Sequence, residues 1–186
     1  MANKVKFGLN NVVVAPITYG ENNSITYGTV FTVPGAVNLT LDQAGETTDF
    51  YADNTKYFTT SANQGYTGSL EMALITDEFK KKIFGMTEDS NGVLMENKDN
   101  TVSDFALGFI INGDSKKTKY WFLQVSAQRP SVASQTIETA KTPITETLNI
   151  TAAARISDGD VKYSCEEGKA GYSSFFTTVY TKETSE

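Results

Sequence analysis

The chain has 186 residues, of which 16 are basic and 22 acidic, and carries a net charge of −6 at pH 7. This acidic balance argues against a nucleic-acid-binding protein, and the absence of histidine excludes a Ser-His-Asp triad, a Cys-His pair and nearly every zinc site. The single cysteine, Cys165, cannot form an internal disulfide and is expected to be a partly buried apolar residue. No apolar run approaches the ~20 residues needed to cross a bilayer, so we expect one domain over residues 1–186 that is made in the cytoplasm.

The first third of the chain is typical of antiparallel strands. The segment NKVKFGLNNVVVAPIT opens with an alternating strand that we expect to stop at Pro16. In AVNLTLD (36–42) and in YTGSLEMALI (66–75), apolar and polar side chains alternate. Strands with one apolar and one polar face indicate an antiparallel sheet that is exposed to solvent on one side.

A long connection with neither strand nor helix periodicity joins these two strands. Between Gly45 and Gly65 it contains four aromatic side chains, Phe50, Tyr51, Tyr57 and Phe58. A long loop with exposed aromatics is typical of a protein–protein anchor, because Tyr and Phe supply contact area at small entropic cost.

One short helix is predicted in TDEFKKKIFG. Thr76 or Asp77 would cap its N-terminus, and Gly85 would end it. Phe79 and Ile83 are four residues apart and would share a face that packs against a sheet.

The second half of the chain returns to strands. DFALGFIINGDSKKTKYWFLQVSAQ predicts a hairpin that turns at residues 112–115, with both faces of its return strand partly covered. ITETLNITAAARI (144–156) predicts a long strand whose apolar side runs from Ile144 to Ile156, interrupted by Glu146. VKYSC and SSFFTTVY predict a second hairpin. The chain is therefore expected to be mainly β, an antiparallel β-sandwich or partly closed barrel with one short flanking α-helix and a long inter-strand loop.

Three classes of function remain open on the residues alone. Strand edges and a projecting aromatic loop favour a self-assembling structural subunit. The loop aromatics could instead stack on sugar rings, so a carbohydrate-binding β-sandwich for host adhesion is the alternative. Asp49 and Asp53 could act as the paired carboxylates of a glycoside hydrolase, but no second feature supports that pairing. We expect no catalytic, cofactor-binding or metal-binding residues, and no enzyme.

Segments spread over nearly the whole chain resemble a known family. The sequence is similar to the major tail proteins that build the tail tube of long, non-contractile-tailed bacteriophages, particularly those of Gram-positive bacteria. The matching segments are FGLNNVVVAPIT (7–18), PGAVNLTLD (34–42), FYADN (50–54), NQGYTGSLEMALI (63–75), NGVLMEN (91–97), FALGF (105–109), QRPS (128–131), TETLNITA (145–152) and the closing DGDVKYS and SSFFTTVY.

The resemblance implies a β-sandwich with a flanking helix that assembles into hexameric rings, stacked into a hollow tube in the virion tail. Residues 42–65 would be the loop that reaches the neighbouring ring, with Phe50, Tyr51, Tyr57 and Phe58 covered by the adjacent subunit. Asp42 and Glu71 would face the lumen, where negative charge repels passing DNA. The implied partners are the tape measure protein, the tail terminator and the distal tail proteins, with no cofactor, no metal and no membrane.

Overall fold

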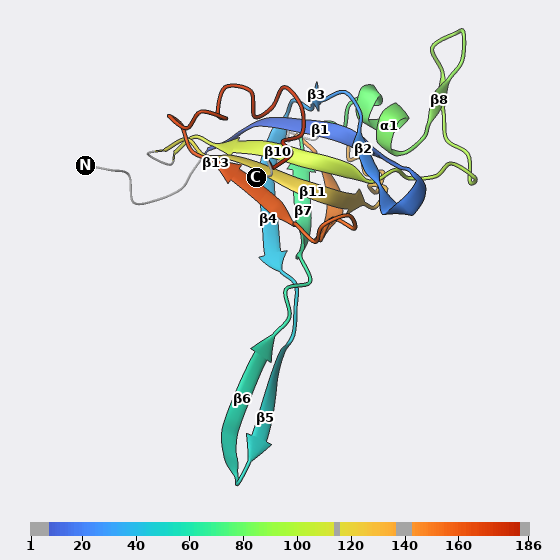
Figure 1. Cartoon of the computed structure of the whole chain (residues 1–186). Helices are drawn as coiled ribbons and strands as arrows, with labels where there is room; N and C mark the ends of the chain where they lie inside the picture. Colours follow the sequence, from blue (N-terminus) through green and yellow to red (C-terminus); the bar gives the residue numbers. More distant parts are fainter. Residues whose placement is uncertain (1–7, 114–115, 137–142, 183–186) are drawn as a thin grey trace.

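The structure is a computed structural model of the chain, and it describes residues 8–113, 116–136 and 143–182. Its main feature is a nine-stranded antiparallel sheet (Figure 1). In pairing order, the strands are β2 (Ile25–Tyr27), β1 (Leu9–Tyr19), β10 (Phe105–Ile111), β11 (Lys119–Ala127), β12 (Glu146–Ala153), β7 (Tyr66–Met72) and β4 (Ala36–Gln43), with β3 (Phe31–Thr32) beside β1 and β13 (Lys162–Cys165) beside β11.

The other elements of the described residues lie outside this sheet. They are the hairpin of β5 (Thr47–Ala52) and β6 (Thr55–Ser61), the short pair of β8 (Thr87–Glu88) and β9 (Leu94–Met95), the helix α1 (Asp77–Ile83) and the 3-10 turn η1 (Glu21–Asn23). A mainly β, antiparallel fold with one α-helix is therefore confirmed.

The sheet folds over one apolar core, as expected for a sandwich. β12, β7 and β4 face β1, β10 and β11 across this core, and α1 covers one end of it. Members from these elements include Val14, Leu70, Met72, Phe79, Phe105, Leu107, Val125, Leu148 and Ile150. Because β2 and β4, the two ends of the pairing order, are not paired with each other in the described chain, the barrel is not closed.

Helix α1 forms where its capping residues predict it. The Thr76 side chain accepts a hydrogen bond from Phe79 N at 3.3 Å, which caps the first turn. Gly85 follows the helix with a φ of +67°, the left-handed conformation that ends helices. Phe79 and Ile83 are both buried, as predicted from their spacing.

A second apolar cluster covers the opposite face of β10 and β11. Trp121 and Leu123 lie in it together with Phe175 and Val179 from the C-terminal segment, so both faces of β11 are covered. The Trp121 indole N–H donates to the Phe175 carbonyl oxygen at 2.6 Å. The strand predicted in SSFFTTVY is wrong: residues 170–177 form turns. The turns bring Phe175 and Val179 into one cluster with Trp121. In a strand, the same two residues would be separated by the full extended length of four residues.

Strand β1 continues past Pro16, contrary to the sequence prediction. Pro16 lies opposite Phe105, and its carbonyl accepts from Gly28 N at 2.8 Å on the other side. The N and the C=O of a strand residue point the same way, so the missing N–H of Pro16 faces the edge near Gly28. On the side of β1 that faces β10, hydrogen bonding continues past Pro16, because the backbone N–H of Ile17 donates to the Asp104 carbonyl oxygen at 2.8 Å.

Strand β12 is shorter than the predicted segment 144–156. Leu148, Ile150 and Ala152 face the core, but Ile144 and Ile156 lie beyond the strand ends and are 40% and 56% exposed. Glu146, which interrupts the apolar pattern, begins the strand and accepts a hydrogen bond from the backbone N–H of Ile75 at 2.6 Å.

Candidate assembly surfaces

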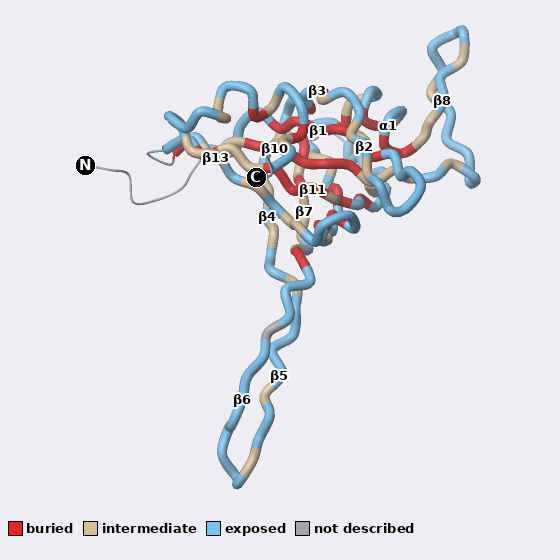
Figure 2. The backbone as a smooth tube through the Cα atoms, viewed as in Figure 1, coloured by how far each residue is buried: buried red, intermediate tan, exposed pale blue. Residues whose placement is uncertain are grey.

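The predicted loop at residues 42–65 is a regular hairpin. β5 and β6 pair with each other, and among the described residues neither pairs with a strand of the main sheet. The hairpin extends away from the body as a two-stranded ribbon that is exposed along most of its length (Figures 1 and 2). Hydrogen bonds from Ala44 N to Gly65 O at 2.8 Å and from Gln64 N to Ala44 O at 2.9 Å join it to the ends of β4 and β7. The hairpin is thus a projecting continuation of this strand pair.

Four aromatic side chains make the hairpin unusually apolar for an exposed ribbon. The exposed fractions are 60% for Phe50, 63% for Tyr51, 77% for Tyr57 and 60% for Phe58. Phe50 and Phe58 lie directly opposite each other, so they share one face. A two-stranded hairpin is marginally stable in water by itself, and covering such a face would stabilise it.

The opposite face of the hairpin carries Tyr51 and Tyr57 beside a pair of opposite charges. Asp49 alternates with Phe50 and so points to the other side. Its Oδ1 lies 2.7 Å from Lys56 Nζ and accepts a hydrogen bond from Thr59 Oγ1 at 2.8 Å. The phenylalanine face is therefore the face of β5 and β6 without charged side chains, which suits it to an apolar contact. Because Asp49 is engaged with Lys56 and Thr59, the structure offers no support for its pairing with Asp53 as a hydrolase dyad.

Two glycines allow the chain to leave the sheet at the base of the hairpin. Gly45 and Gly65 have φ values of +144° and +93°. A Cβ at Gly45 would lie 1.8 Å from the Ala62 carbonyl oxygen, and one at Gly65 would lie 2.0 Å from the Ala152 carbonyl oxygen. Since both approaches are to backbone, only glycine fits at these positions.

Asp42 and Glu71 lie on the same polar face of the sheet. Asp42 is opposite Thr67, and Thr67 and Glu71 are on the same side of β7, while Leu70 is buried on the other side. Glu71 Oε1 accepts a hydrogen bond from Thr145 Oγ1 at 2.6 Å. On β4, β7 and β12 this face, which we call the polar face, consists of Asn38, Thr40, Asp42, Thr67, Ser69, Glu71, Thr147, Asn149 and Thr151. Its two charged members are both acidic.

Arg155 is buried, although the alternation predicts it on the polar side of a strand. Its guanidinium makes two hydrogen bonds to Asp158, at 2.8 and 2.5 Å, and donates to the hydroxyls of Tyr27 at 3.3 Å and Tyr163 at 2.9 Å. Lys182 Nζ in turn lies 3.5 Å from Asp158 Oδ2. This cluster ties β2, the turn after β12, β13 and the end of the described chain together.

Replacing Asp158 by Asn is expected to lower the free energy of unfolding by about 1–2 kcal/mol at pH 7, because the buried Arg155 loses its two-point partner. Hydrogen bonds from Arg155 hold the pKa of the Asp158 carboxyl well below its usual range. A depressed pKa stabilises the fold above the unfolded value of about 3.9, and this contribution is lost as the pH falls through the folded value. In urea unfolding, the difference in free energy of unfolding between the wild type and the variant should therefore be largest at pH 5–7 and become smaller below about pH 4. A difference that does not change with pH would contradict the ion pair.

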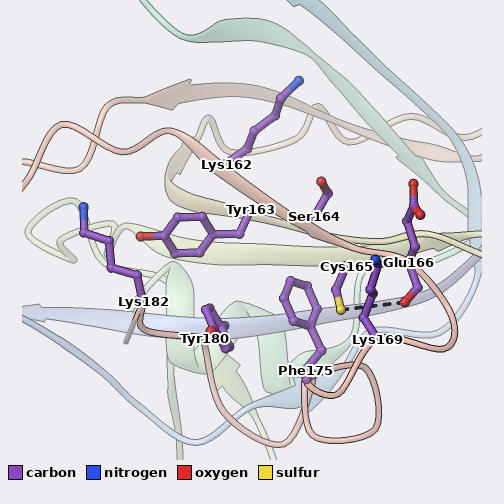
Figure 3. Close-up of a pocket in the computed structure, with 10 residues that line it drawn as sticks. Lys162, Tyr163, Ser164, Cys165, Glu166, Lys169, Phe175, Tyr180 and Lys182 are labelled. Atoms are coloured by element: carbon purple, nitrogen blue, oxygen red, sulfur yellow. Dashed lines mark hydrogen bonds between the residues drawn. The ribbon is translucent and has the colours of Figure 1, made fainter. Parts of the chain in front are cut away.

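A hollow of about 710 Å³ lies between β13 and the C-terminal segment (Figure 3). Its aromatic walls are engaged with one another: the Tyr180 ring lies 5.9 Å from the Tyr163 ring and 5.8 Å from the Phe175 ring. Cys165 is half-buried beside them, as predicted, with its Sγ 3.8 Å from the Glu166 carbonyl oxygen.

Within residues 8–113, 116–136 and 143–182, the structure has no group of three or more His, Cys, Asp or Glu side chains arranged to hold a metal ion. In the same residues, no helix has the length and apolar character needed to span a membrane.

Comparison with known proteins gives a matching family model and similar solved structures. A family model described as phage tail tube protein matches residues 2–154, from ahead of β1 to the end of β12. No curated protein matches the chain. The cryo-EM structure of the anti-feeding prophage cap (AFP tube terminating cap) is similar over 87% of this chain and 93% of that chain, with 11% sequence identity and a TM-score of 0.44.

Proposed function

Because the chain belongs to the phage tail tube protein family, we propose that it assembles into hexameric rings that stack into the tail tube of a virion. Membership of the family makes it a structural component of a phage tail, and the ring size is taken from the family resemblance. The observation that supports stacking is the projecting β5–β6 hairpin with its four exposed aromatics. In a stack, these side chains would be covered by a subunit of the next ring.

The polar face would line the bore of the tube. Its charged side chains, Asp42 and Glu71, would then present negative charge to DNA during ejection. Like charges repel across roughly a Debye length of ~8 Å at physiological salt, so the duplex would slide without binding. The net charge of −6 suits this role.

The proposed partners follow from the position of such a tube in a tail. They are further copies of the chain, the tape measure protein inside the tube, the tail terminator at one end and the distal tail proteins at the other. The protein would act without a cofactor, as a structural component and not as an enzyme.

Negative-stain electron microscopy of the purified protein at high concentration, with light scattering on the same sample, tests the proposal. We expect stacked rings or hollow rods, and a reconstruction with Asp42 and Glu71 on the inner wall. Rods with both carboxylates on the outside would refute the lumen assignment but leave the tube. Monomers that are retained on a glycan column would instead favour a carbohydrate-binding module.

A further inference from the structure

If the hairpin reaches another copy, that copy must offer a surface that receives it. The sheet has two distinct ends. The hairpin leaves at the end where Tyr66 of β7 pairs with Gln43 and Ala152. At the other end, roughly 20 Å away at ~3.3 Å per residue along β7, Met72 pairs with Ala36 and Glu146. Figure 1 shows the hairpin projecting from one end of the body, with α1 and β8 at the other.

A groove of about 240 Å³ lies at this second end, beside Glu146. Its apolar walls come from four segments: Phe84 after α1, Met86 before β8, Leu94 of β9, and Pro130 with Val132 after β11. We call it the α1 groove. Val132 is fully exposed in the isolated chain, and two more apolar side chains at this end of the sheet, Leu74 and Ile144, are 63% and 40% exposed.

The charged groups that line the α1 groove are already engaged. Lys80 Nζ lies 3.5 Å from Asp77, and Arg129 Nε lies 2.8 Å from Glu96. Glu146 Oε2 accepts from a backbone N–H at 2.6 Å. An apolar side chain could therefore enter the groove while the two basic side chains keep their acidic partners and Glu146 keeps its hydrogen bond.

We propose that the α1 groove receives the Phe50–Phe58 face of the hairpin of a second copy. This inference rests on the proposed function and names the receiving surface of the stacking contact. The two surfaces fit chemically, since both are largely apolar and their charged groups already have partners, and interface hot spots are enriched in large side chains that fill desolvated pockets. Because they lie at opposite ends of the same sheet, the contact is head-to-tail and repeats without closing along the stack, as a growing tube requires.

The first test replaces Val132 by Asp. Since the Val132 side chain is fully exposed in the isolated chain, the circular dichroism and the melting temperature of the variant should match those of the wild type. The lowest concentration at which rods form should rise at least about tenfold, because a carboxylate would be buried in an apolar contact. Ile156→Asp is the matched control, because Ile156 is also an exposed β-branched residue and lies beyond the opposite, hairpin-side end of β12. This substitution is expected to change the assembly concentration less than about twofold.

A disulfide test identifies the occupant of the groove. Cys165→Ala removes the native thiol, and Phe58→Cys is combined with Val132→Cys. Oxidised rods should give a ladder of linked chains on a non-reducing gel, whereas the control pair Phe58→Cys with Ser157→Cys should stay monomeric.

The outcomes separate this inference from the proposed function. If the wild type forms rods, then normal assembly of Val132→Asp would refute the α1 groove as the receiving surface. The absence of a disulfide ladder through Val132 would refute it as well, and in both cases the proposed tube would still stand. Absence of wild-type rods would overturn the proposed function, and the groove with it.

Discussion

A variant without the β5–β6 hairpin is expected to fold but not to form tubes. The ends of the hairpin allow a clean deletion, because Ala44 is hydrogen-bonded to both Gln64 and Gly65. Replacing residues 45–63 by Asn-Gly, the preferred two-residue turn, would close β4 directly onto β7. Since β5 and β6 are not paired with the main sheet of the described chain, the melting temperature should stay within a few degrees of the wild type. Electron microscopy should show monomers or single rings; long rods from this variant would refute the stacking role.

A milder pair of variants separates the aromatic side chains from the hairpin backbone. Phe50→Ser with Phe58→Ser removes the apolar face and should abolish rods or raise the assembly concentration by more than tenfold, since each large side chain loses about 1.5–3 kcal/mol of burial in the contact. Thr48→Ser with Thr60→Ser changes an opposed, exposed pair on the same hairpin and should assemble normally.

The sequence predicts those parts of the fold in which one side of an element is buried. Alternation identifies β4, β7 and β12 because each has one face on the core, and the capping pattern identifies α1. The same logic misses β5 and β6: Phe50 and its neighbours are exposed on both faces of a free ribbon, so no alternation of burial is encoded there. Their aromatic content still marks them as a contact surface.

Two features could not be predicted because their parts are distant in the chain. The partners of Arg155 include Tyr27 and Tyr163, which only the topology of the sheet brings together. The α1 groove is likewise assembled from residues 84–94 and 130–132, and none of these residues carries a local signal. For Asp42 and Glu71, by contrast, alternation predicts that each lies on the polar side of its own strand, and the register of β4 and β7 puts those two sides on one face.

The second large effect is expected from Phe79→Ala, which should lower the free energy of unfolding by about 3–5 kcal/mol. Phe79 is 1% exposed, and its ring lies edge-to-face with Phe84 at 5.4 Å and with Phe105 at 5.5 Å. The substitution therefore leaves a cavity between α1 and the sheet and removes two aromatic contacts. Urea unfolding of the hairpin-deleted protein, which is expected not to form rods, would measure this loss without interference from ring stacking.

Lys81→Ala serves as the control, because Lys81 lies on the exposed side of the same helix and should leave the urea midpoint close to that of the parent protein. A loss below about half a kcal/mol for Phe79→Ala would mean that α1 is not docked. Since Phe84, at the end of this helix, also forms a wall of the α1 groove, loosening α1 should disturb the groove as well. Phe79→Ala placed in the full-length chain is then expected to weaken rod formation even at temperatures where the subunit remains folded, which links packing in the core to assembly at the surface.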